Sequence, residues 1–422
     1  MIGQKVLPNG TRVLFEKVDH TQTVSIGFWV LRGSRDEDES VRGYSHFLEH
    51  MLFKGTETRT AFELIQAVDR VGGILNAFTE KEQICYYCTL ASVHADLAVQ
   101  VLSDMLFHSV LPTEEIEREK LVILNEIKEA EDSPEELAYD LFLEKLWGKD
   151  HPLSAKITGD QEHIRSITRE KLEDFYRRTY TPSNILVSVA GDFDPDRLMD
   201  LLGELIPDGP RGPVRKERKN PRISPGISTE YVSGGFQQVQ IYGGTSFELP
   251  DNINEFYDFL VFSTIFGESM SSRLFQGLRE RLGLCYTIYS MRTFFSTTAL
   301  WVIYANTSPG LLKQLIKGLD EEIRRFRLTP PGDDEIADAV THLSGGLILS
   351  LEDMETRMKR MVRHYLLGGE IHTSEVAISL IERVTRRDVG NMSDRVLSGE
   401  NFNLLAYGTR NLGKRKITGL TF

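Results

Sequence analysis

Two histidines and a glutamate stand close together in the segment His46-Phe-Leu-Glu49-His50. On a helix, at about 100° per residue, His46 and His50 lie one turn apart on the same face, so two imidazoles can reach one ion. Glu49 borders that face, within reach of a water molecule held by the ion. Zinc suits such a site because it accepts nitrogen and oxygen donors and keeps a position open for water in catalytic sites. Glu49 would then remove a proton from water and pass it to a leaving amine.

A purely structural interpretation of this segment is a buried helix whose histidines are satisfied by backbone groups. The apolar residues around them fit that interpretation; they are Phe47, Leu48, Met51, Leu52 and Phe53. However, the chain has ten histidines among 422 residues, so the three-residue pattern should arise by chance only about 0.02 times per chain. The pattern therefore favours a metal site.

A third ligand has to come from another part of the chain. The stretch 113–130 is acidic on one side and apolar on the other, as expected for an amphipathic helix. Its Glu119 and Glu126 are seven residues apart and nearly in line along such a helix, and Glu129 is a local competitor. The pattern alone does not choose among them, and all three also fit solvated surface carboxylates.

The segment HFLEHMLFKGT with a downstream E-x6-E resembles the M16 peptidases, the pitrilysin and insulinase family of inverted zincins. The likeness runs through essentially the whole chain, and its length resembles the bacterial and mitochondrial processing-peptidase branch. The resemblance implies one Zn²⁺ per chain, held by His46, His50 and Glu126, with Glu49 as the general base. It also implies that Glu119 orients a ligand from behind, as carboxylates around metal sites do.

Further roles follow from the same resemblance. It implies that a peptide substrate is held as an added β-strand along Asn76, Ala77 and Phe78, and that Arg279 and Tyr286 contact the substrate near the zinc. It also implies a homodimer that encloses unfolded peptides in a chamber and cleaves them as a zinc endopeptidase. The alternative is a non-catalytic scaffold subunit, but relatives of that kind typically lose metal residues that this chain retains.

The elements that must position these residues alternate between strand and helix patterns. Alternating apolar and β-branched runs predict strands, and 3.6-residue periodicity predicts helices, one of which Thr60 is expected to cap. Strands are expected at 12–16, 23–31, 74–79, 83–91 and 184–190, and helices at 45–54, 60–71, 93–109, 113–130, 134–147 and 195–205. The pair 74–79 and 83–91 is expected to be antiparallel. The fold class predicted is α+β.

The second half of the chain repeats this order. Strands are expected at 238–242, 299–305 and 401–408, and helices at 255–266 and 309–326. Short sequence matches recur at nearly constant offsets of 217, 220 and 221 residues, which indicates duplication of one unit. We therefore predict two homologous domains, each a mainly antiparallel sheet flanked by helices. Counting 221 residues forward from His46, His50 and Glu126 gives Gly267, Ser271 and Leu347, so the second domain is expected to be metal-free.

Domain boundaries follow from composition. The stretch 208–226 is rich in Pro, Gly and basic residues and is expected to link a catalytic domain at 1–207 to a homologous domain at 227–422. The basic run from Arg211 to Arg222 is interpreted as a solvated linker, with a docking patch as the alternative.

Charge and hydropathy exclude other classes. A net charge of −13 disfavours nucleic-acid binding, which needs a concentrated positive surface. The first 20 residues lack a signal-peptide pattern, and no apolar run approaches the length of a membrane span, so a cytoplasmic location without membrane partners is expected. Three cysteines do not make a disulfide framework. Cys85 and Cys88 lie three apart on a predicted strand and should face opposite sides of the sheet.

Overall fold

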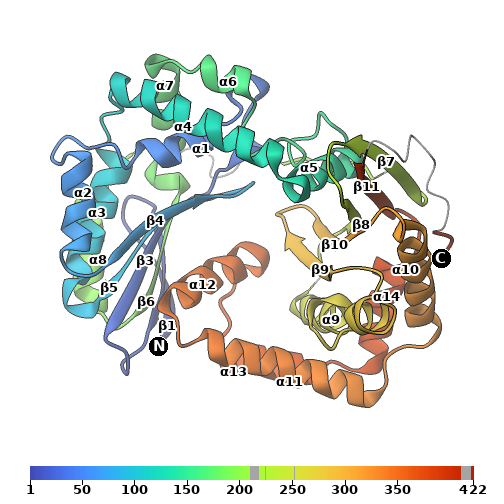
Figure 1. Cartoon of the computed structure of the whole chain (residues 1–422). Helices are drawn as coiled ribbons and strands as arrows, with labels where there is room; N and C mark the ends of the chain where they lie inside the picture. The colour runs from blue at the N-terminus through green and yellow to red at the C-terminus, as the bar shows by residue number, and fades with distance from the viewer. Residues whose placement is uncertain (210–217, 224, 251, 410–419) are drawn as a thin grey trace. The chain divides into compact units, whose positions relative to one another are not determined.

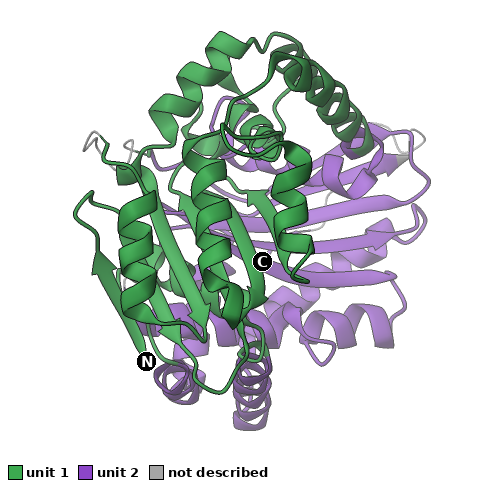
Figure 2. Ribbon diagram, turned by 90° about the vertical axis from the view of Figure 1, so that its left-hand side faces the viewer, with its two compact units in different colours: residues 1–129, 155–218, 350–373 green, residues 130–154, 219–349, 374–422 purple. Residues whose placement is uncertain are grey.

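The computed structural model describes residues 1–209, 218–223, 225–250, 252–409 and 420–422. The chain forms two compact units, each assembled from three stretches of sequence (Figure 2). Unit 1 contains residues 1–129, 155–218 and 350–373; unit 2 contains residues 130–154, 219–349 and 374–422.

Unit 1 is built on a six-stranded sheet. Its strands, in spatial order, are β1 (Ile2–Val6), β2 (Arg12–Lys17), β6 (Ile185–Gly191), β3 (Thr23–Val30), β5 (Ile84–Ala91) and β4 (Ile74–Thr79). Only β2 and β6 run parallel, and the other neighbours are antiparallel. The predicted antiparallel pair 74–79 and 83–91 is confirmed as β4 and β5, and β4 forms one edge of the sheet.

Helices cover both faces of this sheet. Those of unit 1 are α1 (Tyr44–Met51), α2 (Ala61–Asp69), α3 (Ala95–Phe107), most of α4 (Thr113–Asp132), α6 (Gln161–Arg165), α7 (Arg169–Thr179), α8 (Pro195–Leu205) and α12 (Met354–Gly368). Figure 1 shows α2, α3 and α8 on one side of β3, β5 and β6, and α12 on the other. Thr60 caps α2 as predicted, in a capping box with Glu63.

Strand β3 is buried along almost its whole length because both of its faces are covered. Val24, Ile26 and Phe28 point into the core beneath α1 and α3, whereas Trp29 packs with Met358 of α12. A Cβ added at Gly27 would lie 2.6 Å from the sulfur of Met358. Glycine at this position therefore allows α12 to pack closely on the sheet.

Unit 2 repeats the same strand topology. Its sheet order is β7 (Ser228–Gly234), β11 (Asn403–Thr409), β8 (Val239–Phe247), β10 (Ala299–Thr307) and β9 (Thr287–Phe294). Only β7 and β11 are parallel. Taken in chain order, the five strands β7 to β11 occupy the same places as β2 to β6 in unit 1. The prediction of two homologous α+β domains is therefore confirmed.

The helices of unit 2 include one supplied by the first half of the chain. They are α5 (Pro134–Trp147), α9 (Ile253–Ser263), α10 (Leu312–Leu328), α11 (Asp333–Ser350), α13 (Ser374–Glu382) and α14 (Arg386–Val396). Helix α5 packs on one face of the unit 2 sheet through Ala138, Phe142 and Leu146. Its counterpart α12, from the second half, packs in unit 1. The compact units thus differ from the contiguous stretches 1–207 and 227–422 by this exchange of helices.

The expected linker is described only in part, because residues 210–217 and 224 lie outside the described residues, and positions 211–217 of the basic run are among them. The side chain of Arg218, within that run, is only 8% exposed and pairs with Asp36 at 2.6 Å and with Glu82 at 3.3 Å. The interpretation of the run as solvated is therefore wrong at Arg218. Its charge is compensated by Asp36, in the turn of 3-10 helix Ser34–Asp36 after β3, and by Glu82, between β4 and β5. Local composition does not reveal these partners.

The cysteines behave as predicted. Cys85, Cys88 and Cys285 are free and buried. Cys85 faces the cluster around α12 and Cys88 faces the opposite core, because alternate strand residues point to opposite faces.

Candidate metal centre

Helix α1 carries His46, Glu49 and His50, and its start is fixed by a buried acid. Gly43 precedes the helix with φ at 87°, a left-handed conformation that glycine adopts readily. The backbone N–H groups of Gly43 and Ser45 donate to the Glu37 carboxylate at 2.8 and 2.6 Å. Burial raises the pKa of Glu37 to about 7 despite these hydrogen bonds. The sequence pattern does not indicate Glu37, because helix-capping preferences concern the residue next to the helix and Glu37 lies seven residues before α1.

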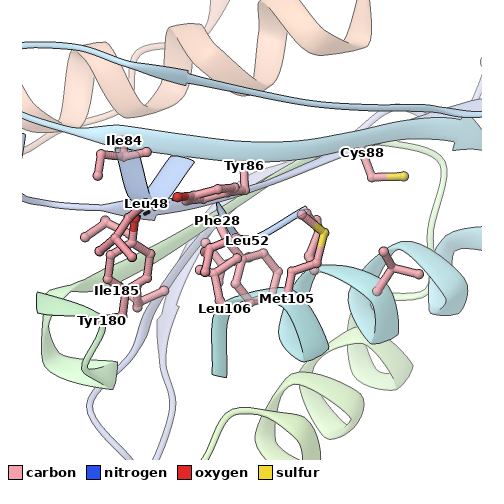
Figure 3. Packing of buried hydrophobic residues seen from close by; sticks show 14 of the residues in the cluster. Phe28, Leu48, Leu52, Ile84, Tyr86, Cys88, Met105, Leu106, Tyr180 and Ile185 are labelled. Carbon is pink, nitrogen blue, oxygen red and sulfur yellow. Dashed lines mark hydrogen bonds between the residues drawn. The ribbon is translucent and has the colours of Figure 1, made fainter. Parts of the chain in front are cut away.

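The apolar side of α1 anchors it to the core. Leu48 and Leu52 are fully buried and lie near Phe28, Tyr86 and Leu106 (Figure 3). Burial on this scale contributes roughly 1.5–3 kcal/mol per large side chain. With the apolar side anchored in this way, the two histidines and Glu49 occupy the partly exposed side of the helix.

The structure brings His46, His50 and Glu126 together. The Nε2 atoms of His46 and His50 lie 3.9 and 3.8 Å from Oε2 of Glu126, on α4. One donor atom from each of the three residues lies within 4.8 Å of the other two. Of the three acids that the sequence left open, Glu126 is thus the one that faces both imidazoles, and Glu129 is exposed.

Glu119 lies one step behind this cluster. Its Oε2 is 3.0 Å from Nδ1 of His50, and its Oε1 is 2.5 Å from Nζ of Lys54. Burial would raise the pKa of Glu119, but the hydrogen bonds from His50 and Lys54 outweigh it and lower this pKa. Glu119 is therefore an ionised acceptor that directs Nε2 of His50 toward Glu126. Lys54 was missed, although it belongs to the motif segment.

The two imidazoles differ in their electrostatics. Burial, and then the neighbouring His50, lower the pKa of His46 to about 4. Burial also opposes a charge on His50, but its hydrogen bond with Glu119 and the charges of Glu126 and Glu119 raise its pKa overall. At neutral pH, His46 is consequently neutral and offers a lone pair to a metal ion.

The residues present fit zinc. Two ligands about 2.1 Å from a tetrahedral ion are about 3.4 Å apart, close to the 3.8 and 3.9 Å between the histidine and Glu126 atoms. Two imidazole nitrogens and one carboxylate oxygen are also the donors of a catalytic zinc site with three protein ligands. Small movements of these side chains are enough to reach bonding distances.

Glu49 is held next to this cluster by the edge strand. The hydroxyl of Thr79 donates to Oε2 of Glu49 at 2.5 Å. Burial raises the pKa of Glu49, while the hydrogen bond from Thr79 partly opposes the increase. A carboxylate with a raised pKa is better suited to accept and release a proton near neutral pH.

The residues expected to bind substrate, Asn76, Ala77 and Phe78, lie on β4. Its outer edge pairs with none of the strands that the structure describes, as an added strand requires. The ring of Phe78 packs against Trp29 at 5.6 Å and lies under the ammonium of Lys359. The side chain of Phe78 thus stabilises the fold. Along its outer edge, β4 presents backbone N–H and C=O groups.

Arg279 and Tyr286 lie together in unit 2. Arg279 belongs to a π-helical turn, Phe275–Arg281, a distortion often found at functional positions. Its guanidinium lies 4.5 Å from the ring centre of Phe275 and 5.8 Å from that of Tyr286. Tyr286 is 76% exposed. The metal cluster, in contrast, lies within unit 1.

Comparisons with known proteins place these features in a family. Residues 12–161 match the family model of insulinase (peptidase family M16), and residues 166–343 match that of the peptidase M16 inactive domain. The chain is 33% identical to the uncharacterized zinc protease YmxG of Bacillus subtilis, over 96% of this chain and 97% of that protein. It is 35% identical to the uncharacterized zinc protease ML0855 of Mycobacterium leprae, over 93% of this chain and 88% of that one.

A solved structure shows the same fold. The crystal structure of a protease from Helicobacter pylori superposes with a TM-score of 0.88 and 18% sequence identity, over 96% of this chain and 99% of that one. The chain belongs to the M16 peptidase family. Among the residues that the structure describes, no helix is long and apolar enough to cross a membrane.

Proposed function

We propose that the protein is a zinc-dependent endopeptidase that cleaves unfolded peptides bound as an added strand on β4. The observation that carries this proposal is the convergence of His46, His50 and Glu126, with donor atoms within 4.8 Å of one another. Two relatives of the chain are named zinc proteases. These names support zinc as the metal and peptide-bond hydrolysis as the reaction.

In the proposed mechanism, the metal and Glu49 have different roles. His46, His50 and Glu126 would hold the zinc ion, which when bound would supply Lewis-acid activation of water and of the scissile carbonyl. Glu49 accepts the proton of the attacking water at Oε1, because Thr79 engages its Oε2, and delivers that proton to the leaving amine nitrogen. The motif places Glu49 and the two histidine ligands within about one turn of α1, while the third ligand, Glu126, comes from α4.

Substrate specificity would begin with the backbone. A peptide paired along β4 would place alternate side chains on the two faces of the sheet, and an unfolded segment is able to adopt this extended conformation. We further propose that Arg279 and Tyr286 contact the substrate, that one zinc binds per chain, and that a homodimer encloses the peptide in the cytoplasm. The family resemblance supports these roles.

The endopeptidase assignment is tested with an internally quenched fluorogenic peptide blocked at both ends. We expect cleavage within the peptide, its loss after removal of metal with a chelator, and its recovery when one equivalent of Zn²⁺ per chain is restored. Cleavage that persists without metal would contradict the proposal, as would no cleavage of blocked peptides by zinc-loaded protein.

Replacement of Glu119 by Gln should lower activity more than it lowers zinc content. The amide can still accept from one neighbour but lacks the charge that supports His50 and Lys54. Changes to such outer partners typically cost about 10- to 100-fold. Turnover and zinc content measured on the same preparation check this expectation, and unchanged turnover would refute the role of Glu119.

A further inference from the structure

Thr79 links the proposed substrate strand to the proposed base through its side chain. It is the last residue of β4, and its hydroxyl donates to Oε2 of Glu49 at 2.5 Å. Thr79 lies on the same face of β4 as Leu75 and Ala77, because residues two apart point the same way, and both of these pack against the core that contains α1. The strand therefore presents the hydroxyl directly to the helix that carries the metal ligands.

The hydroxyl limits what the Glu49 carboxylate can do. A glutamate side chain has three rotatable bonds, and holding it in one orientation has an entropic cost that a single strong contact can offset. Because Oε2 already accepts the hydrogen bond from Thr79, Oε1 is the oxygen better placed to exchange a proton with water. Misplacement of a catalytic group by about 1 Å can cost about 100-fold in rate.

We propose that Thr79 is a positioning residue that orients the general base Glu49 from the end of the substrate-binding strand. This inference rests on the proposed function, in which Glu49 is the base. In this proposal, β4 pairs with the peptide backbone and, through Thr79, also orients Glu49, the group that protonates the leaving amine. The same strand therefore positions both the scissile bond and the base.

Two variants separate this role from a structural one. Thr79→Val keeps the shape and the β-branched side chain, which strands favour, but lacks the hydroxyl. Thr79→Ser keeps the hydroxyl and lacks the methyl group. A structural role predicts that the Val variant is the more active; a positioning role predicts the reverse.

The experiment measures kcat, KM and zinc content of both variants and determines their crystal structures. We expect kcat to fall between about 10- and 100-fold in Thr79→Val, with KM and zinc content unchanged, and to recover to near the wild-type value in Thr79→Ser. In the crystal, Glu49 should leave its native rotamer in the Val variant and retain it in the Ser variant.

The crystal structures decide the inference even if the protein cleaves no peptide, so failure of the proposed function is distinguishable from failure of this proposal. A native Glu49 rotamer in Thr79→Val overturns it. Equal kcat values for the Val variant and the wild type overturn it as well.

Discussion

Replacement of Glu49 by Gln is expected to abolish peptide cleavage while leaving zinc bound. Glutamine preserves the size of the side chain and can still accept the hydrogen bond from Thr79, but it cannot accept the proton of the attacking water. General acid–base groups contribute about 100- to 10,000-fold, so turnover should fall by at least the lower value. The measurement is the rate of fluorogenic peptide cleavage together with zinc content.

Glu57→Gln provides the matched control, since Glu57 follows the same helix and its side chain is 71% exposed. This variant should cleave at the wild-type rate. If Glu49→Gln cleaved as fast as the control with the same zinc content, Glu49 would not be the base, and the proton would have to be accepted by another group.

The second large effect is expected at the third ligand. Replacing Glu126 by Gln removes the carboxylate that is proposed as the third zinc ligand and that lies within 4 Å of both imidazoles. The loss of zinc affinity should exceed the 10- to 100-fold typical of partners outside the ligand shell, and activity should fall with it. Zinc content after dialysis against a weak chelator, measured beside activity, reports both.

Glu129→Gln tests whether zinc binding requires a carboxylate at position 126 of α4 or only a negative charge on that part of the helix. Glu129 lies three residues further on the same helix and is exposed, so its replacement should leave zinc content and turnover intact. Loss of zinc from the Glu129 variant, together with retention by the Glu126 variant, would exchange the roles of these two residues.

Local sequence pattern was sufficient for the elements that carry the chemistry. The periodicity around His46 predicted α1, although the helix ends at Met51 and not at residue 54. Alternating apolar and β-branched residues in two closely spaced runs predicted the pair β4 and β5. These predictions hold because each depends on neighbours within about ten residues, where helix and strand periodicities differ most clearly.

Contacts between segments far apart in the sequence could not be predicted from local sequence pattern. The spacing of Glu119, Glu126 and Glu129 left the third ligand open, because the choice depends on how α4 crosses α1. The hydrogen bonds from α1 to Glu37 and the contact between Thr79 and Glu49 likewise depend on tertiary packing. The exchange of α5 and α12 between the units has the same origin, because each helix packs on a sheet whose strands lie far away in the sequence.

The strand topology of unit 2 gives physical support to the duplication inferred from short matches. Five strands in the same spatial order, with one parallel pair at the same place, repeat a specific arrangement that α+β composition does not by itself require. In contrast, positions 267, 271 and 347 of the second half hold Gly, Ser and Leu. The duplicated architecture is thus retained where the ligand residues are not repeated.

The most direct test of the metal centre is anomalous diffraction at the zinc absorption edge from crystals of the zinc-loaded protein. We predict one strong peak per chain, about 2.0–2.2 Å from Nε2 of His46, Nε2 of His50 and a carboxylate oxygen of Glu126. A peak at other residues, or none at these three in protein that cleaves peptides, would contradict it.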